Sequence, residues 1–150
     1  MNSAKVLICS AFVMISGLST ILPAFAANED VIEILVEPPQ EVERWFAALG
    51  SVNKREFDEL IAENAKIVLK DLGVEQTKQE FISALAEWQR LTRGANIIYR
   101  YVSIDGNSVA VNVCYRFKSN EQLNLEVFTF GDEQITGSVQ DFVGNKCGDM

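Results

Sequence analysis

The spacing of apolar residues changes its period at Gly94, and this change constrains the fold more than any other feature of the sequence. Before Gly94, apolar side chains recur every three or four residues, which is the period of an α-helix. After Gly94 they alternate with polar side chains, as in a β-strand that buries one face. The chain is therefore expected to place helices first and strands second, an order typical of the α+β class.

Four strands are predicted after Gly94, and short turns separate them. The turns are Asp105-Gly106-Asn107, Ser119-Asn120 and Asp132-Glu133. Connections this short join neighbouring strands in antiparallel order, so the strands should form a meander. The expected bounds are Ile97–Ile104, Ser108–Lys118, Gln122–Gly131 and Gln134–Val143.

Three helices are predicted before Gly94. The first starts near Gln40, buries a stripe that includes Trp45, and ends at Gly50, which is placed as a C-cap glycine. A brief strand at Ile67–Leu69 is expected between the second and third helices. The second and third helices each begin with a capping side chain followed three residues later by Glu, namely Asn53 with Glu56 and Thr77 with Glu80.

The first 26 residues have the pattern of a cleaved secretory signal. Lys5 supplies a positive charge, an apolar run follows, and cleavage is expected after Ala26 at a small-x-small exit. The alternative is a membrane anchor, although Ser, Gly and Thr interrupt the run, which is short for a bilayer span. Export is therefore expected, to the periplasm if the source is a Gram-negative bacterium and otherwise to the medium.

The composition disfavours several classes of function. The chain has 21 acidic and 13 basic residues, a net charge of −8 and no Lys/Arg cluster, which argues against binding to nucleic acid or to anionic membrane surfaces. It has no histidine, the commonest general base and metal ligand, and no nucleotide-binding phosphate loop. We therefore expect no nucleic-acid partner, no membrane contact after cleavage, no metal and no cofactor.

The rest of the chain should form one domain, at residues 38–143, between an unassigned extension at 27–37 and a tail at 144–150. Removal of the signal leaves Cys114 and Cys147, an even pair in an exported chain, and a disulfide between them is expected. The alternative is a buried thiol in a strand and a free thiol in a loose tail.

The strand at Gln122–Gly131 is apolar on both faces near its end, because Leu125 and Val127 alternate with Glu126 and Phe128. One face should meet the helices. A second subunit is expected to cover the other face, which predicts a homodimer centred near Leu125 and Val127. The alternative is that these apolar residues simply lie on the surface.

The order of these segments resembles the nuclear transport factor 2-like superfamily, in its SnoaL-like and ketosteroid-isomerase-like branch. The stretches VERWFAAL, EFDELIAENAKIVLKD, TKQEF and LEVFTFGDEQITGSVQ carry the resemblance, which covers roughly residues 38–143. It implies a cone-shaped α+β fold, with three helices packed on a curved antiparallel sheet of four long strands and a short one, and a pocket at the open end. Members include cofactor-free isomerases, dehydratases and cyclases, as well as proteins that only bind or assemble.

The resemblance also implies a pair of carboxylates in the pocket. Asp71 stands where the isomerase pattern has its general base, and Glu126 where it has a protonated acid that donates to an oxyanion. Trp45 replaces the tyrosine of the pattern and departs from it, since an indole N–H is a weaker acid than a phenol. Two carboxylates in one apolar pocket cannot both ionise cheaply, so one could act as acid and the other as base.

Both Asp71 and Glu126 also have a purely structural interpretation. Asp71 could be a turn residue, although Gly73 lets the chain turn without it, and we therefore expect Asp71 to face the pocket. Glu126 could be a solvated rim residue or a partner of Arg116. Further pocket candidates are aromatic or acidic by type: Trp45, Tyr99, Tyr115 and Phe128, with Tyr101 and Asp141.

Three functions remain open from the sequence. The favoured one is an exported protein that binds a small apolar ligand without catalysis. The second is a cofactor-free isomerase or lyase that uses Asp71 as base together with Glu126. The third is a structural or interaction domain whose own side chains fill the pocket. The volume of the pocket should distinguish the third from the others.

Overall fold

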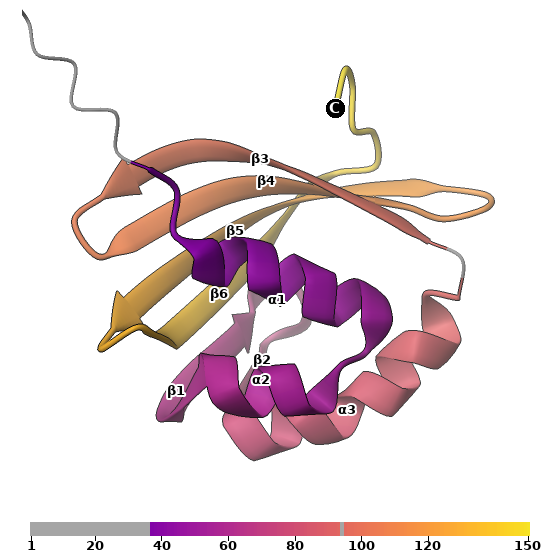
Figure 1. Cartoon of the computed structure of the whole chain (residues 1–150). Coiled ribbons are helices and arrows are strands. Elements are labelled where there is room, and N and C mark those ends of the chain that lie inside the picture. Colours follow the sequence, from indigo (N-terminus) through magenta and orange to yellow (C-terminus); the bar gives the residue numbers. More distant parts are fainter. Residues whose placement is uncertain (1–36, 94) are drawn as a thin grey trace, which may run out of the picture. The chain divides into compact units, whose positions relative to one another are not determined.

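The computed structural model describes residues 37–93 and 95–150, and within them all three helices precede the four strands that follow Gly94, as predicted, while two further strands lie between the second and third helices (Figure 1). The predictions for residues 1–36, including cleavage after Ala26, lie outside the described residues. The helices are α1 (Gln40–Ser51), α2 (Lys54–Leu60) and α3 (Lys78–Leu91), with a 3₁₀ turn, η1 (Lys70–Leu72). The strands are β1 (Ile61–Leu69), β2 (Val74–Thr77), β3 (Asn96–Asp105), β4 (Ser108–Arg116), β5 (Glu121–Gly131) and β6 (Gln134–Gly144).

The strands form one six-stranded sheet in the order β2-β1-β6-β5-β4-β3. Strands β3 to β6 make the predicted antiparallel meander. The expectation of a purely antiparallel sheet is wrong, because β1 pairs with β6 in parallel. Short turns determine how sequence neighbours pair, but they carry no information about a pairing between segments about seventy residues apart. The α+β class is as predicted, with the helices on one face of a curved sheet (Figure 1).

The region between the second and third helices differs from the prediction. The brief strand expected at Ile67–Leu69 is nine residues long, because Ile61 takes an extended backbone at the end of α2 instead of continuing the helix. The four-residue strand β2 was not predicted. It is an edge strand whose residues are mostly exposed, so it lacks the alternation that marks a half-buried strand.

The helix starts agree with the sequence, whereas the end of α1 does not. The Asn53 side chain accepts the Glu56 N–H, and Thr77 and Glu80 form a complete capping box. Gly50 lies inside α1, and the left-handed position falls at Val52, with φ of 55°. Val52 is half-buried against the core, and the following N–H, of Asn53, bonds to the Ala48 carbonyl at 2.9 Å. The left-handed backbone at this position would by itself favour glycine, but apolar packing against the core favours valine.

The core lies between the helices and the facing side of the sheet, and an aromatic cluster fills its centre. Trp45 of α1 stacks on Phe81 of α3, with ring centroids 5.1 Å apart. It also meets the edges of Phe57 of α2 and Phe128 of β5 at 5.1 Å and 5.3 Å. Trp45, Phe57 and Phe128 are almost completely buried. One indole thus joins all three helices to the sheet.

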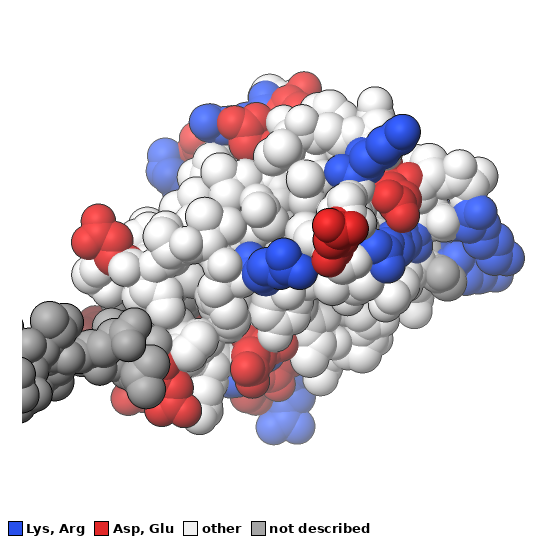
Figure 2. Space-filling view, turned by 90° about the horizontal axis from the view of Figure 1, so that it is seen from above, with Lys and Arg blue, Asp and Glu red and all other residues white. Residues whose placement is uncertain are grey.

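The other face of the sheet carries a stripe of half-buried apolar side chains on β5. Leu123, Leu125 and Val127 alternate with the buried residues Asn124 and Glu126 and so point away from the helices. Figure 2 views the molecule from the side of the sheet and shows an uncharged area bordered by charged side chains. The predicted homodimer through this face stays a prediction.

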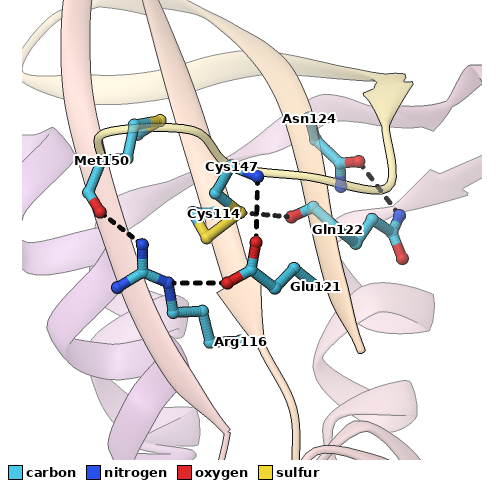
Figure 3. Close-up of a disulfide and its surroundings, with 7 residues drawn as sticks. All are labelled: Cys114, Arg116, Glu121, Gln122, Asn124, Cys147 and Met150. Carbon is cyan, nitrogen blue, oxygen red and sulfur yellow. Dashed lines mark hydrogen bonds and ion pairs between the residues drawn. A yellow bond between two sulfur atoms is a disulfide. The ribbon is translucent and has the colours of Figure 1, made fainter. Parts of the chain in front are cut away.

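The predicted disulfide is present and fastens the C-terminal tail to this outer face of the sheet (Figure 3). Cys114 of β4 lies between two residues of the core, so its side chain points to the opposite face and meets Cys147 with a Cα–Cα distance of 5.7 Å. The Glu121 carboxylate accepts the Cys147 N–H at 3.1 Å, and Arg116 donates to the Met150 carbonyl. The tail is therefore held by a covalent bond and by charged hydrogen bonds.

Candidate ligand-binding cavity

A cavity of about 240 Å³ lies between the helices and the inner face of the sheet. Helices α1 and α3 and strands β1, β2, β4, β5 and β6 all contribute to its wall. Its aliphatic lining consists of Leu49, Ile67, Leu69, Ala84, Leu85 and Leu91, and its aromatic lining of Trp45, Phe81, Trp88 and Tyr115. The polar lining is limited to Gln76, Glu87, Glu126 and Gln140. The wall is thus mainly apolar, as in many small-molecule sites.

The periods of the elements explain why these side chains meet. Along α3 the lining residues recur every three or four positions, which keeps them on one helix face. In the sheet, Glu126 of β5 lies directly opposite Gln140 of β6, and the next inward pair is Phe128 with Ser138. Two neighbouring strands therefore present a carboxyl and an amide to the same cavity.

Glu126 is the most unusual group of the site, because it is a carboxyl with only 3% of its surface exposed. One carboxyl oxygen, Oε1, accepts a hydrogen bond from the Ser138 hydroxyl at 2.7 Å. None of the described residues donates to its other oxygen. Burial raises the pKa of Glu126 to about 7, although the Ser138 hydrogen bond lowers it in part. Near neutral pH the group can therefore either donate or accept a proton.

The alternatives weighed for Glu126 from the sequence are both wrong. Its burial excludes a solvated rim position. Arg116 pairs instead with Glu121, with 3.3 Å between Nε and Oε1, on the outer side of the sheet. Glu126 thus has no cationic partner among the described residues, which is uncommon for a buried acid.

Tyr115 is the aromatic wall residue that carries a hydroxyl group. Its side chain is 4% exposed and meets the edge of Trp88, with ring centroids 5.4 Å apart. Burial and the charge of Glu126 raise the pKa of Tyr115 well above its ordinary value. The hydroxyl therefore stays protonated at all physiological pH values.

The mouth of the cavity is marked by lining residues that are also exposed. Leu91 is 63% exposed, and Glu87 of the preceding turn is exposed as well. Arg90 donates hydrogen bonds to the Glu87 carboxylate, and these lower the pKa of Glu87. The carboxylate of Glu87 at the mouth is thus paired with a cation, whereas the carboxyl of Glu126 inside the cavity has no cationic partner among the described residues.

Asp71 does not line the cavity, so the expected pair of carboxylates does not form. Asp71 lies in η1, is exposed, and is absent from the cavity wall, which β1 reaches with Leu69. Lys70 pairs with Asp141 of β6 at 3.1 Å, and Gly73 closes the turn with φ of 62°. The expectation that Asp71 faces the pocket is not met, because the chain turns outward as soon as β1 ends.

The other predicted pocket residues divide between the cavity and the core. Trp45 and Tyr115 line the cavity. Phe128 is fully buried but lies against Trp45 and outside the wall. Tyr99 stacks on Phe46, with centroids 4.4 Å apart, and is also outside the wall. The candidates taken by type alone, Tyr101 and Asp141, do not line the cavity either.

Trp88 and Gln140 are wall residues that the sequence analysis did not name for the site. Trp88 falls on the buried stripe of α3, and that stripe was a signal for it. Gln140 becomes identifiable once β5 and β6 are paired, because it then lies opposite Glu126.

The described residues show neither a membrane-spanning element nor a metal site. No helix within them combines the length and apolar character needed to span a membrane. No group of three or more Cys, Asp or Glu side chains in residues 37–93 and 95–150 is arranged to hold a metal ion.

Comparisons with known proteins place the chain by its fold. No protein-family model and no curated protein sequence matches it. Among solved structures, it is similar to IdmH, a candidate polyketide cyclase from Streptomyces antibioticus, with a TM-score of 0.62 and 16% identity over 71% of this chain and 91% of that one. A candidate ketosteroid isomerase from Kribbella flavida has a TM-score of 0.58 and 15% identity over 75% and 82% of the two chains.

A candidate isomerase of the SnoaL-like family from Agrobacterium tumefaciens is also similar, with a TM-score of 0.59 and 12% identity over 70% of this chain and 96% of that one. At such identities the similarity establishes the fold. The chain has the α+β fold of the SnoaL-like and ketosteroid-isomerase-like proteins, which is the fold that the resemblance in its sequence implied.

Proposed function

We propose that this protein binds a small, mainly apolar organic molecule in the cavity and holds one polar group of that molecule at Glu126. The observation that carries the proposal is the contrast within the wall, where aliphatic and aromatic side chains surround one buried carboxyl. Water forms no hydrogen bonds with apolar walls, so its displacement by the apolar part of a ligand lowers the free energy. A polar group of the ligand would satisfy the carboxyl oxygen to which no described residue donates.

The volume sets the size of the ligand. A space of about 240 Å³ equals roughly eight water molecules at ~30 Å³ each. It therefore suits a molecule with on the order of ten non-hydrogen atoms, smaller than a typical drug-sized ligand. A volume of this size also argues against a pocket filled by the protein's own side chains.

Export is part of the proposal. The signal pattern of residues 1–26 and the Cys114–Cys147 disulfide both support it, because disulfides persist in oxidising compartments.

The second candidate is a cofactor-free isomerase or lyase acting on a small carbonyl compound. The observation that favours it is the pKa of Glu126, about 7, which suits a group that both takes and returns a proton. Such a reaction would depend on Glu126 without Asp71, since Asp71 is outside the cavity wall. Proton exchange at the α-carbon of cyclohexanone, followed by NMR in D₂O, distinguishes this candidate. Acceleration that disappears in Glu126→Gln would favour it over binding alone.

The binding proposal can be tested by blocking the cavity from its mouth. Ala84 and Ala86 are both exposed on α3, but only Ala84 lines the cavity. We expect cyclohexanol, cyclohexanone or cyclohexylamine to shift amide NMR signals around the cavity in the wild type and in Ala86→Trp. In Ala84→Trp the same titrations should show no such shifts. If none of the three probes binds the wild type, or if Ala84→Trp binds them equally well, the proposal is wrong.

A further inference from the structure

We propose that the polar group held at Glu126 is a cation, so that the ligand is a small organic amine with an apolar body. This inference rests on the proposed function and names the chemical class of its ligand. Three features of the cavity carry it, namely the charges of its wall, the unfilled hydrogen-bonding capacity of Glu126, and the aromatic rings that line the space.

The charges of the wall all have one sign. The described residues that line the cavity include two acids, Glu87 and Glu126, and no Lys or Arg. Glu87 is exposed and bonded to Arg90, so Glu126 supplies the charge of the interior. A bound anion would face a like charge across a medium that screens poorly, whereas a bound cation would give the carboxylate a partner it lacks.

The carboxyl of Glu126 has room for a strong donor. Ser138, completely buried beneath it, occupies Oε1, and no described residue donates to Oε2. An ammonium group carries N–H donors and no acceptor, and its bonds to a carboxylate are charge-assisted. A neutral alcohol or ketone forms only an ordinary hydrogen bond at the same oxygen. The geometry therefore favours an amine over a neutral molecule of the same shape.

The aromatic part of the wall supports the same class of ligand. The four rings that line the cavity come from three different elements: Trp45 of α1, Phe81 and Trp88 of α3, and Tyr115 of β4. The face of an aromatic ring attracts a cation, and indole does so most strongly. A cavity with a mainly apolar wall can thus bind both the positive charge of an amine and the hydrocarbon part of the same molecule.

The inference has a consequence for pH. The titratable or charged groups around Glu126 are Tyr115 on β4 and the Glu87–Arg90 pair on α3, while the lining residues of α1, β1, β2 and β6 are uncharged. Tyr115 keeps its proton and Glu87 stays ionised near neutral pH, since its pKa is lowered. Glu126 is therefore the group whose ionisation controls binding of a cation in this range. The affinity for an amine should rise with pH and level off above about 7.

Cyclohexylamine, cyclohexanol and cyclohexanecarboxylate provide a matched test, because they share one ring and differ in the polar group. We expect NMR or calorimetric titration at pH 8 to show at least tenfold tighter binding of the amine than of the alcohol, and the weakest binding for the carboxylate. Glu126→Gln should bring the amine to the level of the alcohol. Glu59→Gln makes the same change on the exposed surface of α2, outside the cavity, and should leave the amine preference intact.

A second measurement needs no variant. In the wild type, binding of cyclohexylamine should be about tenfold weaker at pH 6 than at pH 8, while binding of cyclohexanol changes in the opposite direction or not at all. Equal affinities for amine and alcohol at pH 8, or tighter binding of the carboxylate, would overturn the inference and leave the proposed function standing. An amine preference that survives Glu126→Gln would overturn the inference and the role of Glu126 in the proposed function, while binding in the cavity would stand. Failure of all neutral and charged probes to bind would remove both.

Discussion

Replacing Glu126 with Gln should stabilise the folded protein at alkaline pH. A glutamate has an ordinary pKa of 4.5, and burial raises that of Glu126 to about 7 in the folded state. Between these two values the folded state holds the proton more firmly than the unfolded state does, so the free energy of unfolding falls as pH rises through this window. A shift of roughly 2.5 pKa units at about 1.4 kcal/mol each corresponds to about 3 kcal/mol.

The assay is urea denaturation, followed by circular dichroism, at several pH values from 5 to 8.5. The glutamine carbonyl can still accept the hydrogen bond from Ser138, so the variant keeps the shape and the contact while removing the ionisation. We expect the free energy of unfolding of Glu126→Gln to be higher than that of the wild type by about 3 kcal/mol at pH 8. At pH 5 the two free energies should agree within ~1 kcal/mol. The surface variant Glu59→Gln should follow the wild-type curve at every pH.

One result would refute this reasoning. If the free energies of unfolding of the wild type and of Glu126→Gln stay parallel from pH 5 to pH 8.5, the pKa of Glu126 is not raised in the folded state, and the group is ionised throughout this range. The buried carboxylate would then be stabilised in its ionised form by something that the contacts of Ser138 and Tyr115 do not provide. A selective loss of stability in Glu126→Gln at alkaline pH would contradict the reasoning as well.

Three further predictions concern other parts of the molecule. The disulfide spans 33 residues, so the double variant Cys114→Ser, Cys147→Ser should lose about 4 kcal/mol of unfolding free energy, and equal urea midpoints for it and the oxidised wild type would contradict this. Light scattering should give a dimer mass at micromolar concentration and a monomer mass for Leu125→Glu, whereas a monomeric wild type would exclude the dimer through the outer face. Asp71→Asn should leave cyclohexylamine binding unchanged and alter stability by less than ~0.5 kcal/mol, and a tenfold loss of affinity would return Asp71 to the site.

The predictable parts of the fold are those determined by short stretches of neighbouring residues. The capping pairs, the change of period at Gly94 and the short turns each act over a few residues, and the structure follows them. The parallel pairing of β1 with β6 depends on packing between distant segments, and no local pattern encodes it. The extension of β1 back to Ile61 has the same origin, because Ile61 is buried and pairs with Ile135 of β6.

The candidate site shows the same division. Glu126 could be placed because the resemblance assigned it to the pocket, and on β5 it is one of the buried residues that alternate with the half-buried ones. Asp71 could not be oriented, because a one-turn 3₁₀ segment decides whether its side chain points into the protein or out of it. Ser138 beneath Glu126 also escaped the sequence analysis, since a serine in a strand looks ordinary until its cross-strand neighbours are known.

The position of β6 has a consequence for the order in which the protein can fold. It is the last of the described strands in sequence, yet it lies in the middle of the sheet, between β1 and β5. A nascent chain that has not yet reached Gln134 can form helices and the β3–β5 meander, but it has nothing to join β1 and β2 to that meander. Completion of the core therefore waits for segments distant in sequence to meet, which is typical of slow folding. The six-stranded sheet can therefore close only after Gln134–Gly144 has been synthesised.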